Sequence, residues 1–202
     1  MKFLDFKRQF QNFNIITYQD IKNVFGKVNK AQLSNWKQKG YLISARKGMY
    51  ILADTEIDKM LMANELNDSY ISLEFALSFY QIIPEITQAI TSISKDRQEE
   101  VSNKFSTFYY HKISSKLFTG FILHKSTIKS ERFIRIAEPE KALFDLIYLR
   151  SDLKNKNDFD ALRLNLEKFR IQVFKRYSQL VKAKRIKTRL EKFIEYYYAF
   201  IQ

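Results

Sequence analysis

The sequence has 202 residues, of which 46% are hydrophobic and 15% aromatic, with only four Gly and two Pro. This composition predicts a packed, largely helical chain, and the length allows one substantial domain and a small one. The absence of cysteine excludes disulfides and Cys-ligated zinc, and there are only two histidines, His111 and His124. We therefore expect neither a metal nor a cofactor. No apolar run is long enough for a membrane span and the N-terminus is charged, so we expect a cytoplasmic protein.

Charge is distributed unevenly along the chain, whose formal net charge is +13. Residues 1–53 hold ten Lys and Arg against two Asp and Glu, whereas residues 54–100 hold three against ten. Residues 101–152 hold nine against five, and residues 153–202 hold thirteen against five. Two basic ends around an acidic middle favour a polyanionic partner, because clustered cations displace counterions from phosphates. The alternative is a set of solvated surface lysines.

The first 25 residues predict two helices. Phenylalanines recur at helical spacing and place one buried face on the first helix, at Phe3, Phe6, Phe10 and Phe13. Thr17 stands where an N-cap begins the second helix, with Asp20 in its first turn, and Gly26 ends it.

Residues 29–53 predict a third helix and a hairpin. Asn29 and Gln32 stand in a capping-box relation, apolar residues follow, and Gly40 closes the helix. Short β-prone runs at 41–45 and 49–53 then flank a turn at Arg46-Lys47-Gly48. Helix, tight turn, helix and hairpin together predict a winged helix-turn-helix over residues 1–53.

The rest of the chain predicts a mixed α+β domain, for an α+β fold overall. Residues 54–68 read as an acidic connecting helix, and residues 69–202 as the α+β domain with a helical C-terminus. Ser72 is expected to cap a helix that runs to Pro84. Strand-like runs suggest an antiparallel sheet, at residues 86–93, 105–113, 118–124 and 133–136. Pro139 begins a further helix.

Two helices are expected in the C-terminal tail. Their apolar faces consist of Phe159, Leu162, Leu166 and Phe169 in one helix, and Leu190, Phe193, Ile194 and Tyr197 in the other.

The third helix offers a face for a DNA major groove. Leu33 and Trp36 lie on its inner side, and the opposite side carries Ala31, Ser34, Asn35 and Gln38. Asn and Gln pair with adenine and Ala contacts a thymine methyl, whereas no arginine is present for guanine, so we expect an A·T-rich site. Phosphate contacts are expected from Lys27, Lys30, Lys39, Arg46 and Lys47. The alternative is a winged helix that contacts protein through a solvated polar face.

A second basic patch lies in the tail, at Lys182, Lys184, Arg185, Lys187, Arg189 and Lys192. It is a second phosphate contact, a face for an acidic partner, or a solvated helix surface.

No catalytic pattern stands out, and we expect no enzyme. Glu138, Glu140 and Asp145 lie on one helix, where acids near the start favour the helix dipole, so capping is the preferred interpretation. His111 and His124 lie in strand-like segments without a carboxylate pattern and are read as ordinary surface or core histidines.

Two segments, YISLEFALSFYQIIPE (70–85) and IAEPEKALFDLIYL (136–149), resemble signature segments of AbiEi-like antitoxins, and they follow a winged helix that ends KGYLISARKGMYIL. The resemblance covers the chain to about residue 150. It implies a type IV toxin-antitoxin pair of the abortive-infection kind, in which the antitoxin represses its operon at inverted repeats and counters a co-encoded nucleotidyltransferase toxin. It also marks a structural or antitoxic segment at Glu138, Pro139, Glu140 and Lys141.

The sequence therefore predicts an antitoxin and autorepressor that binds double-stranded DNA and no membrane. Two rival hypotheses remain open. One is an RNA-binding or enzymatic factor that uses the winged helix to recruit its substrate. The other is an interaction module that holds the toxin directly.

Overall fold

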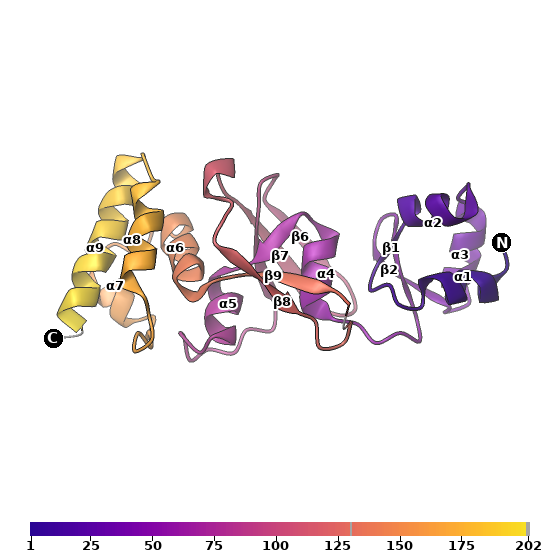
Figure 1. The fold of residues 1–202 in the computed structure, drawn as a ribbon, viewed down its shortest axis with the longest axis horizontal. Coiled ribbons are helices and arrows are strands. Elements are labelled where there is room, and N and C mark those ends of the chain that lie inside the picture. Colours follow the sequence, from indigo (N-terminus) through magenta and orange to yellow (C-terminus); the bar gives the residue numbers. More distant parts are fainter. Residues whose placement is uncertain (130, 201–202) are drawn as a thin grey trace.

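The computed structural model describes residues 1–129 and 131–200. The molecule is elongated, with a small N-terminal unit at one end, a six-stranded sheet in the middle and a group of helices at the C-terminal end (Figure 1). None of the helices in the described ranges is both long and apolar enough to cross a membrane. The expected α+β class is confirmed.

The N-terminal unit combines three helices with a small antiparallel sheet in the strand order β1-β3-β2. Its elements are α1 (Phe3–Phe10), β1 (Ile16–Thr17), α2 (Tyr18–Phe25), α3 (Lys30–Gln38), β2 (Leu42–Arg46) and β3 (Met49–Leu52). Phe6 and Phe10 are fully buried, as their spacing predicts. Thr17 and Asp20 form a complete capping box on α2. Gly48 supplies the positive φ of 80° in the turn between β2 and β3.

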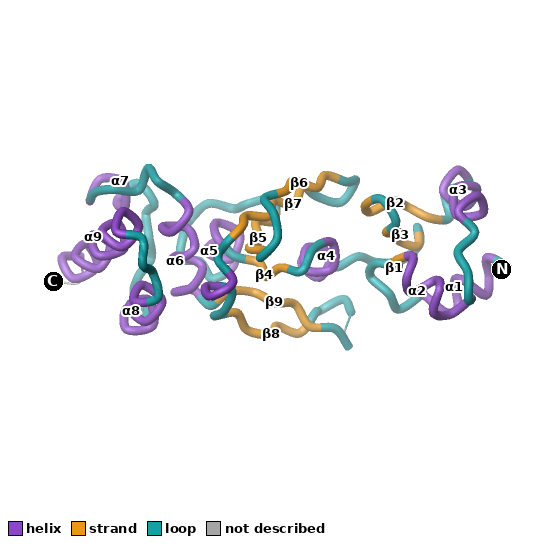
Figure 2. The backbone as a smooth tube through the Cα atoms, turned by 90° about the horizontal axis from the view of Figure 1, so that it is seen from above, coloured by secondary structure: helices purple, strands orange, loops and turns teal. Residues whose placement is uncertain are grey.

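The remainder of the chain builds on a six-stranded sheet in the order β6-β7-β5-β4-β9-β8. Its elements are α4 (Lys59–Leu66), β4 (Ser69–Ile71), α5 (Leu73–Phe79), β5 (Ile90–Ser94), β6 (Glu99–Ser102), β7 (Thr107–Lys112), the 3-10 turn η1 (Ser115–Leu117), β8 (Phe121–Lys125), β9 (Phe133–Ala137), α6 (Pro139–Leu149), α7 (Lys156–Asp160), α8 (Ile171–Gln179) and α9 (Lys184–Phe200). In Figure 2 the sheet lies between α4, on the side of the N-terminal unit, and α5 with α6 on the other side. Helices α7, α8 and α9 form an outer layer beyond α6 (Figures 1 and 2).

This sheet is mixed, so the expectation of an antiparallel sheet holds for the pairs β4–β5, β6–β7 and β8–β9 but not for the others. β4 runs parallel to β9, and β5 runs parallel to β7. Strand β6 was not predicted from the sequence, and its presence explains why β5 and β7 are parallel. The chain reverses into β6 at the sheet edge and reverses again into β7, so that β7 returns in the direction of β5 and lies beside it.

Several local expectations also differ from the structure. Ser72 does not cap α5, because its hydroxyl binds elsewhere in the core. Phe159, Leu162, Leu166 and Phe169 do not share one helix: α7 ends at Asp160, and helix α8, which was not expected, begins at Ile171. α4 begins at Lys59 and its side chains are largely buried, so it belongs to the packed body. α6 with Pro139 in its first turn is confirmed, and so is α9.

Candidate nucleic-acid interface

The orientation of α3 is fixed by its buried side. Leu33 is fully buried and Trp36 is 6% exposed. The indole ring lies 5.2 Å from the ring of Phe3 and 5.1 Å from that of Phe6, measured between centroids. These contacts turn the opposite side outward, and all four residues predicted to face a major groove are exposed: Ala31, Ser34, Asn35 and Gln38.

The sequence predicts two reciprocal capping hydrogen bonds at the start of α3, and the structure contains one of them. The side chain of Asn29 accepts a hydrogen bond from the backbone N–H of Gln32 at 3.1 Å. The amide of Gln32 donates instead to the carbonyl of Met1 at 2.7 Å. The second half of the expected capping box is therefore absent, and Gln32 ties α3 to the chain before α1.

Exposed lysines lie before α3, at its two ends and in the β2–β3 turn. Lys27 precedes the helix, Lys30 and Lys39 lie at its two ends, and Lys47 lies in the β2–β3 turn. The ammonium of Lys30 lies 5.7 Å from the ring centroid of Tyr18. Among the described residues, none of these four lysines has an acidic side chain within ion-pair distance. The polar side of α3 and the four lysines form what we call the α3 surface.

Arg46 is placed differently from the lysine that follows it. Its guanidinium donates to the carbonyl of Leu66 at 3.1 Å and pairs with the carboxylate of Glu99 at 2.7 Å. Arg97 shares the same carboxylate at 3.1 Å. The guanidinium is thus turned toward the sheet domain, whereas Lys47 remains exposed at the turn.

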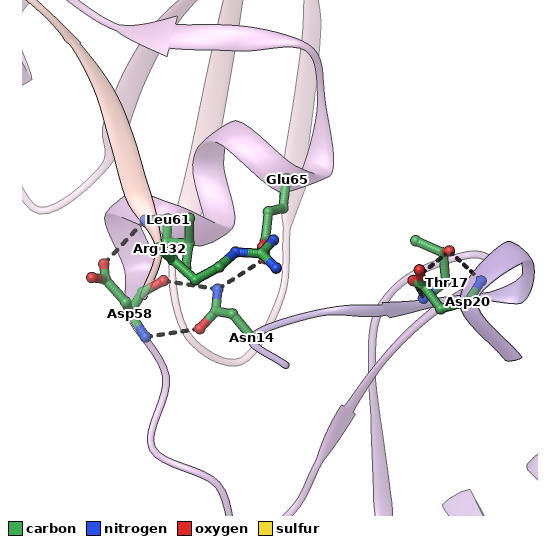
Figure 3. Close-up of polar contacts among 7 residues, drawn as sticks. All are labelled: Asn14, Thr17, Asp20, Asp58, Leu61, Glu65 and Arg132. Atoms are coloured by element: carbon green, nitrogen blue, oxygen red, sulfur yellow. Dashed lines mark hydrogen bonds and ion pairs between the residues drawn. The ribbon is translucent and has the colours of Figure 1, made fainter. Parts of the chain in front are cut away.

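The N-terminal unit and the sheet domain meet through polar contacts as well as through the core. Figure 3 shows Asn14 between Asp58 and Glu65. The amide of Asn14 donates to the Asp58 carbonyl at 3.1 Å and to the Glu65 carboxylate at 3.2 Å, and its oxygen accepts from the Asp58 N–H at 3.0 Å. Arg132 pairs with the same Glu65 carboxylate. Burial raises the pKa of Glu65, while Arg132 and Asn14 act in the opposite direction.

The apolar part of this junction is continuous with the main core. Ile15, Ala45 and Ile51 are buried and belong to the same hydrophobic cluster as Leu61 and Met62 of α4. The small sheet therefore has two buried faces, one against its own helices and one against the sheet domain. This arrangement holds the α3 surface in a fixed orientation relative to the rest of the chain.

The segment around α6 contains a buried ion pair. Lys141 and Asp145, one helical turn apart, pair with each other, and both side chains are 0% exposed. The carboxylate of Asp145 also accepts from Tyr70 at 2.9 Å and from Ser72 at 2.8 Å, and Lys141 donates to the Tyr70 hydroxyl at 2.8 Å. Burial raises the pKa of Asp145 and lowers that of Lys141.

Glu138 and Glu140 also bind partners across the fold. Glu138 is the N-cap residue of α6 but its side chain makes no capping hydrogen bond, so the expected capping is absent, whereas Glu140 lies in the first turn, where an acid favours the helix dipole. Glu140 accepts from the backbone N–H of Arg170 at 3.0 Å and from its guanidinium at 2.9 and 2.8 Å. Burial acts to raise the pKa of Glu140, but these hydrogen bonds outweigh it and the pKa is lowered. Glu138 accepts from Arg170 at 3.0 Å and from Tyr177 at 3.2 Å. The segment therefore joins α6 to α8 and β4.

The two histidines do not come together. His111 lies on β7 and His124 on β8, which are separated by β5, β4 and β9 in the sheet. Burial lowers the pKa of His111. The ring of His124 packs edge-on against Phe79 at 5.5 Å. In residues 1–129 and 131–200, no group of three His, Asp or Glu side chains is arranged to hold a metal ion.

The second basic patch is mostly exposed. Lys182 precedes α9, and Lys184, Arg185, Lys187 and Lys192 project from it into solvent. Arg189 differs, because its guanidinium donates to the carbonyls of Ile147 at 2.9 Å and Tyr148 at 2.7 Å, near the end of α6.

No known family profile matches the chain, and no characterised protein is similar enough in sequence to match it.

Proposed function

We propose that the chain is a DNA-binding repressor whose residues 1–53 form a winged helix. The observation that carries this proposal is the α3 surface, in which an exposed polar helix face is accompanied by four exposed lysines that have no acidic side chain within ion-pair distance among residues 1–129 and 131–200. The element order α1-β1-α2-α3-β2-β3 and the strand order β1-β3-β2 suit a winged helix, in which α3 enters the major groove and the β2–β3 turn is the wing.

The side chains on this face favour A·T base pairs. Asn35 and Gln38 can donate to and accept from adenine, and Ala31 can contact a thymine methyl group. Lys27, Lys30, Lys39 and Lys47 would bind phosphates and so fix the register of α3 on the duplex. In this proposal Arg46 does not bind a phosphate, because its guanidinium is already bound to Glu99 of the sheet domain.

We further propose that the repressor is the antitoxin of a bacterial toxin-antitoxin operon and acts in the cytoplasm on its own inverted-repeat operator. The two segments at 70–85 and 136–149 support this role through their resemblance to AbiEi-like antitoxins. The partner in function would be a nucleotidyltransferase toxin. The buried contacts of Lys141 and Asp145 favour a structural role for the second segment, because neither side chain reaches the surface.

The first experiment is a band shift on DNA from immediately upstream of the gene, with unrelated DNA of equal length as the comparison. A specific repressor retains its preference for the upstream DNA at about 150 mM salt, where binding through phosphates alone fades for both DNAs. Equal binding to both DNAs under these conditions would contradict sequence-specific recognition.

Two substitutions then separate base contacts from phosphate contacts. Asn35→Ala should lower the preference for the operator by about 1 to 3 kcal/mol. Lys47→Ala should weaken binding to all DNA similarly and reduce the salt slope by about 1. The matched controls are Asn157→Ala and Lys112→Ala, which are exposed far from α3 and should change neither quantity. If Asn35→Ala behaves like Asn157→Ala, the proposed face of α3 is wrong.

A further inference from the structure

Helix α9 lies at the end of the molecule opposite to α3 (Figure 1), and it carries part of a second cationic surface. This surface is a groove of about 560 Å³ between α9 and the turn that follows α6. From the turn it is lined by Ser151 and Lys154, and from α9 by Lys184, Arg185, Thr188, Arg189 and Lys192. We call this the α9 groove.

The cations of the α9 groove are presented by fixed elements. Leu190 and Phe193 are fully buried and anchor the inner side of α9. Arg189 is held by the carbonyls of Ile147 and Tyr148. On the other wall, Leu153 is 2% exposed and anchors the turn that carries Lys154. The groove is therefore formed by the packed fold.

The acidic side chains beside the groove have other partners. Asp152 pairs with Arg150 at 2.5 Å, and its charge also acts on Arg189, which lines the groove. Glu191 lies 3.9 Å from Lys187, which does not line the groove. Within the described part of the chain, the side-chain nitrogens of Lys154, Lys184, Arg185 and Lys192 have no carboxylate within 4.0 Å, although the backbone N–H of Lys154 donates to the Asp158 carboxylate at 2.7 Å. The positive end of the α9 dipole at Lys184 adds to the same potential. The groove therefore offers several cationic side chains to an anion.

The lining indicates which part of a ligand it would recognise. The α9 residues repeat along one helix side from Lys184 to Lys192, which spans about 12 Å at 1.5 Å per residue. This length exceeds a single phosphate and suits several phosphates in a row. Among the residues that the structure describes, the lining has no aromatic ring for stacking a base and no carboxylate or amide side chain for reading a base edge.

We propose that the α9 groove is a second anion site, which binds a run of linked phosphates without reading a base. A single-stranded nucleic-acid backbone and a free polyphosphate, such as that of a nucleoside triphosphate, share this chemistry. The site is separate from the α3 surface and works independently of it.

The test uses the full chain and three probes: a labelled oligouridine followed by fluorescence anisotropy, and ATP and inorganic tripolyphosphate followed by calorimetry. The groove variant combines Lys184→Gln, Arg185→Gln and Lys192→Gln. The control removes the same charge elsewhere with Lys112→Gln, Lys125→Gln and Lys168→Gln, all at exposed positions. The groove variant should bind oligouridine about tenfold more weakly at low salt, with a salt slope reduced by about 2, while the control stays near the unchanged protein.

The probes distinguish the source of the phosphates. If ATP and tripolyphosphate bind and displace oligouridine, the groove accepts free polyphosphates; if only oligouridine binds, its ligand is a nucleic-acid backbone. Either result supports the proposal, provided that the groove variant lowers the binding. The proposal is overturned if the unchanged protein binds none of the probes at low salt, or if the groove and control variants bind equally.

Operator DNA gives an independent readout for the separation of the two sites. The groove variant should retain operator binding, and a Lys30→Gln, Lys39→Gln, Lys47→Gln variant should retain oligouridine binding. A loss of both activities in either variant would show one shared site and overturn the proposal.

Discussion

Removal of the Lys141 ammonium should destabilise the fold strongly, because it leaves a buried carboxylate without its cation. In Lys141→Met, Asp145 stays 0% exposed and keeps only the hydrogen bonds from Tyr70 and Ser72. Breaking a buried ion pair by removing one partner costs about 3 to 5 kcal/mol. Because two hydroxyls still donate to Asp145, we expect a loss of about 3 kcal/mol in the free energy of unfolding.

The combination of Lys141→Met with Asp145→Asn tests whether the unpaired buried carboxylate causes this loss of stability. The asparagine oxygen can still accept from Tyr70 or Ser72, and no buried charge remains. The double variant should therefore recover about 2 kcal/mol relative to Lys141→Met alone. Urea unfolding followed by circular dichroism measures both values. In a thermal melt, the single variant should lose roughly 6 to 12 °C.

Two results would refute this reasoning. One is a cost below about 1 kcal/mol for Lys141→Met, and the other is a double variant no more stable than the single one. Operator binding at a temperature where Lys141→Met remains folded provides the functional control. It should be unchanged, because the ion pair lies in the sheet domain and contacts no residue of the α3 surface.

Three further predictions concern the packing of α3, the Glu140 network and the junction. Trp36→Ala should cost about 3 to 5 kcal/mol and abolish operator binding, as measured by urea unfolding and band shift. Glu140→Gln should cost about 1.5 to 3 kcal/mol at neutral pH. Because the pKa of Glu140 is lowered, its contribution exists above the ordinary value of 4.5 and is lost as the pH falls through the lowered pKa, so the two unfolding curves should converge in acid. Arg46→Gln should increase proteolysis near residue 54 while the salt slope of DNA binding stays unchanged, because the guanidinium is already paired with Glu99; a reduced slope would instead indicate a phosphate contact.

The elements that could be predicted from the sequence are those whose signals lie close together in the chain. Thr17 and Asp20 cap α2 from three residues apart, and Pro139 begins α6. Ser72 carries an equally good local signal, but its hydroxyl binds Asp145, 73 positions later. Arg46 is similar, since its partner Glu99 lies 53 positions away. Residues of the same type are thus used differently once distant parts of the chain meet.

The two candidate sites differ in the same way, since one depends on signals close together in the chain and the other on distant contacts. Exposure of the polar side of α3 could be predicted from Leu33 and Trp36, because both residues point inward on the same helix. The α9 groove could be predicted only as a basic run. Its second wall, with Lys154, comes from a separate turn, and Arg189 is oriented by α6. The concave shape therefore required the packing of α9 on α6.

The charge distribution and the shape together restrict how a duplex could lie on this molecule. Helices α3 and α9, which carry the α3 surface and one wall of the α9 groove, are at opposite ends, and the acidic stretch 54–100 forms much of the body between them (Figure 1). Exposed acids such as Glu56 and Glu100 lie in this body, so a duplex along the long axis would gain less counterion release there than at the α3 end. A duplex across the α3 end avoids them, and the junction at Asn14 holds α3 in one orientation there. The α9 groove is then left free for a different ligand while DNA is bound.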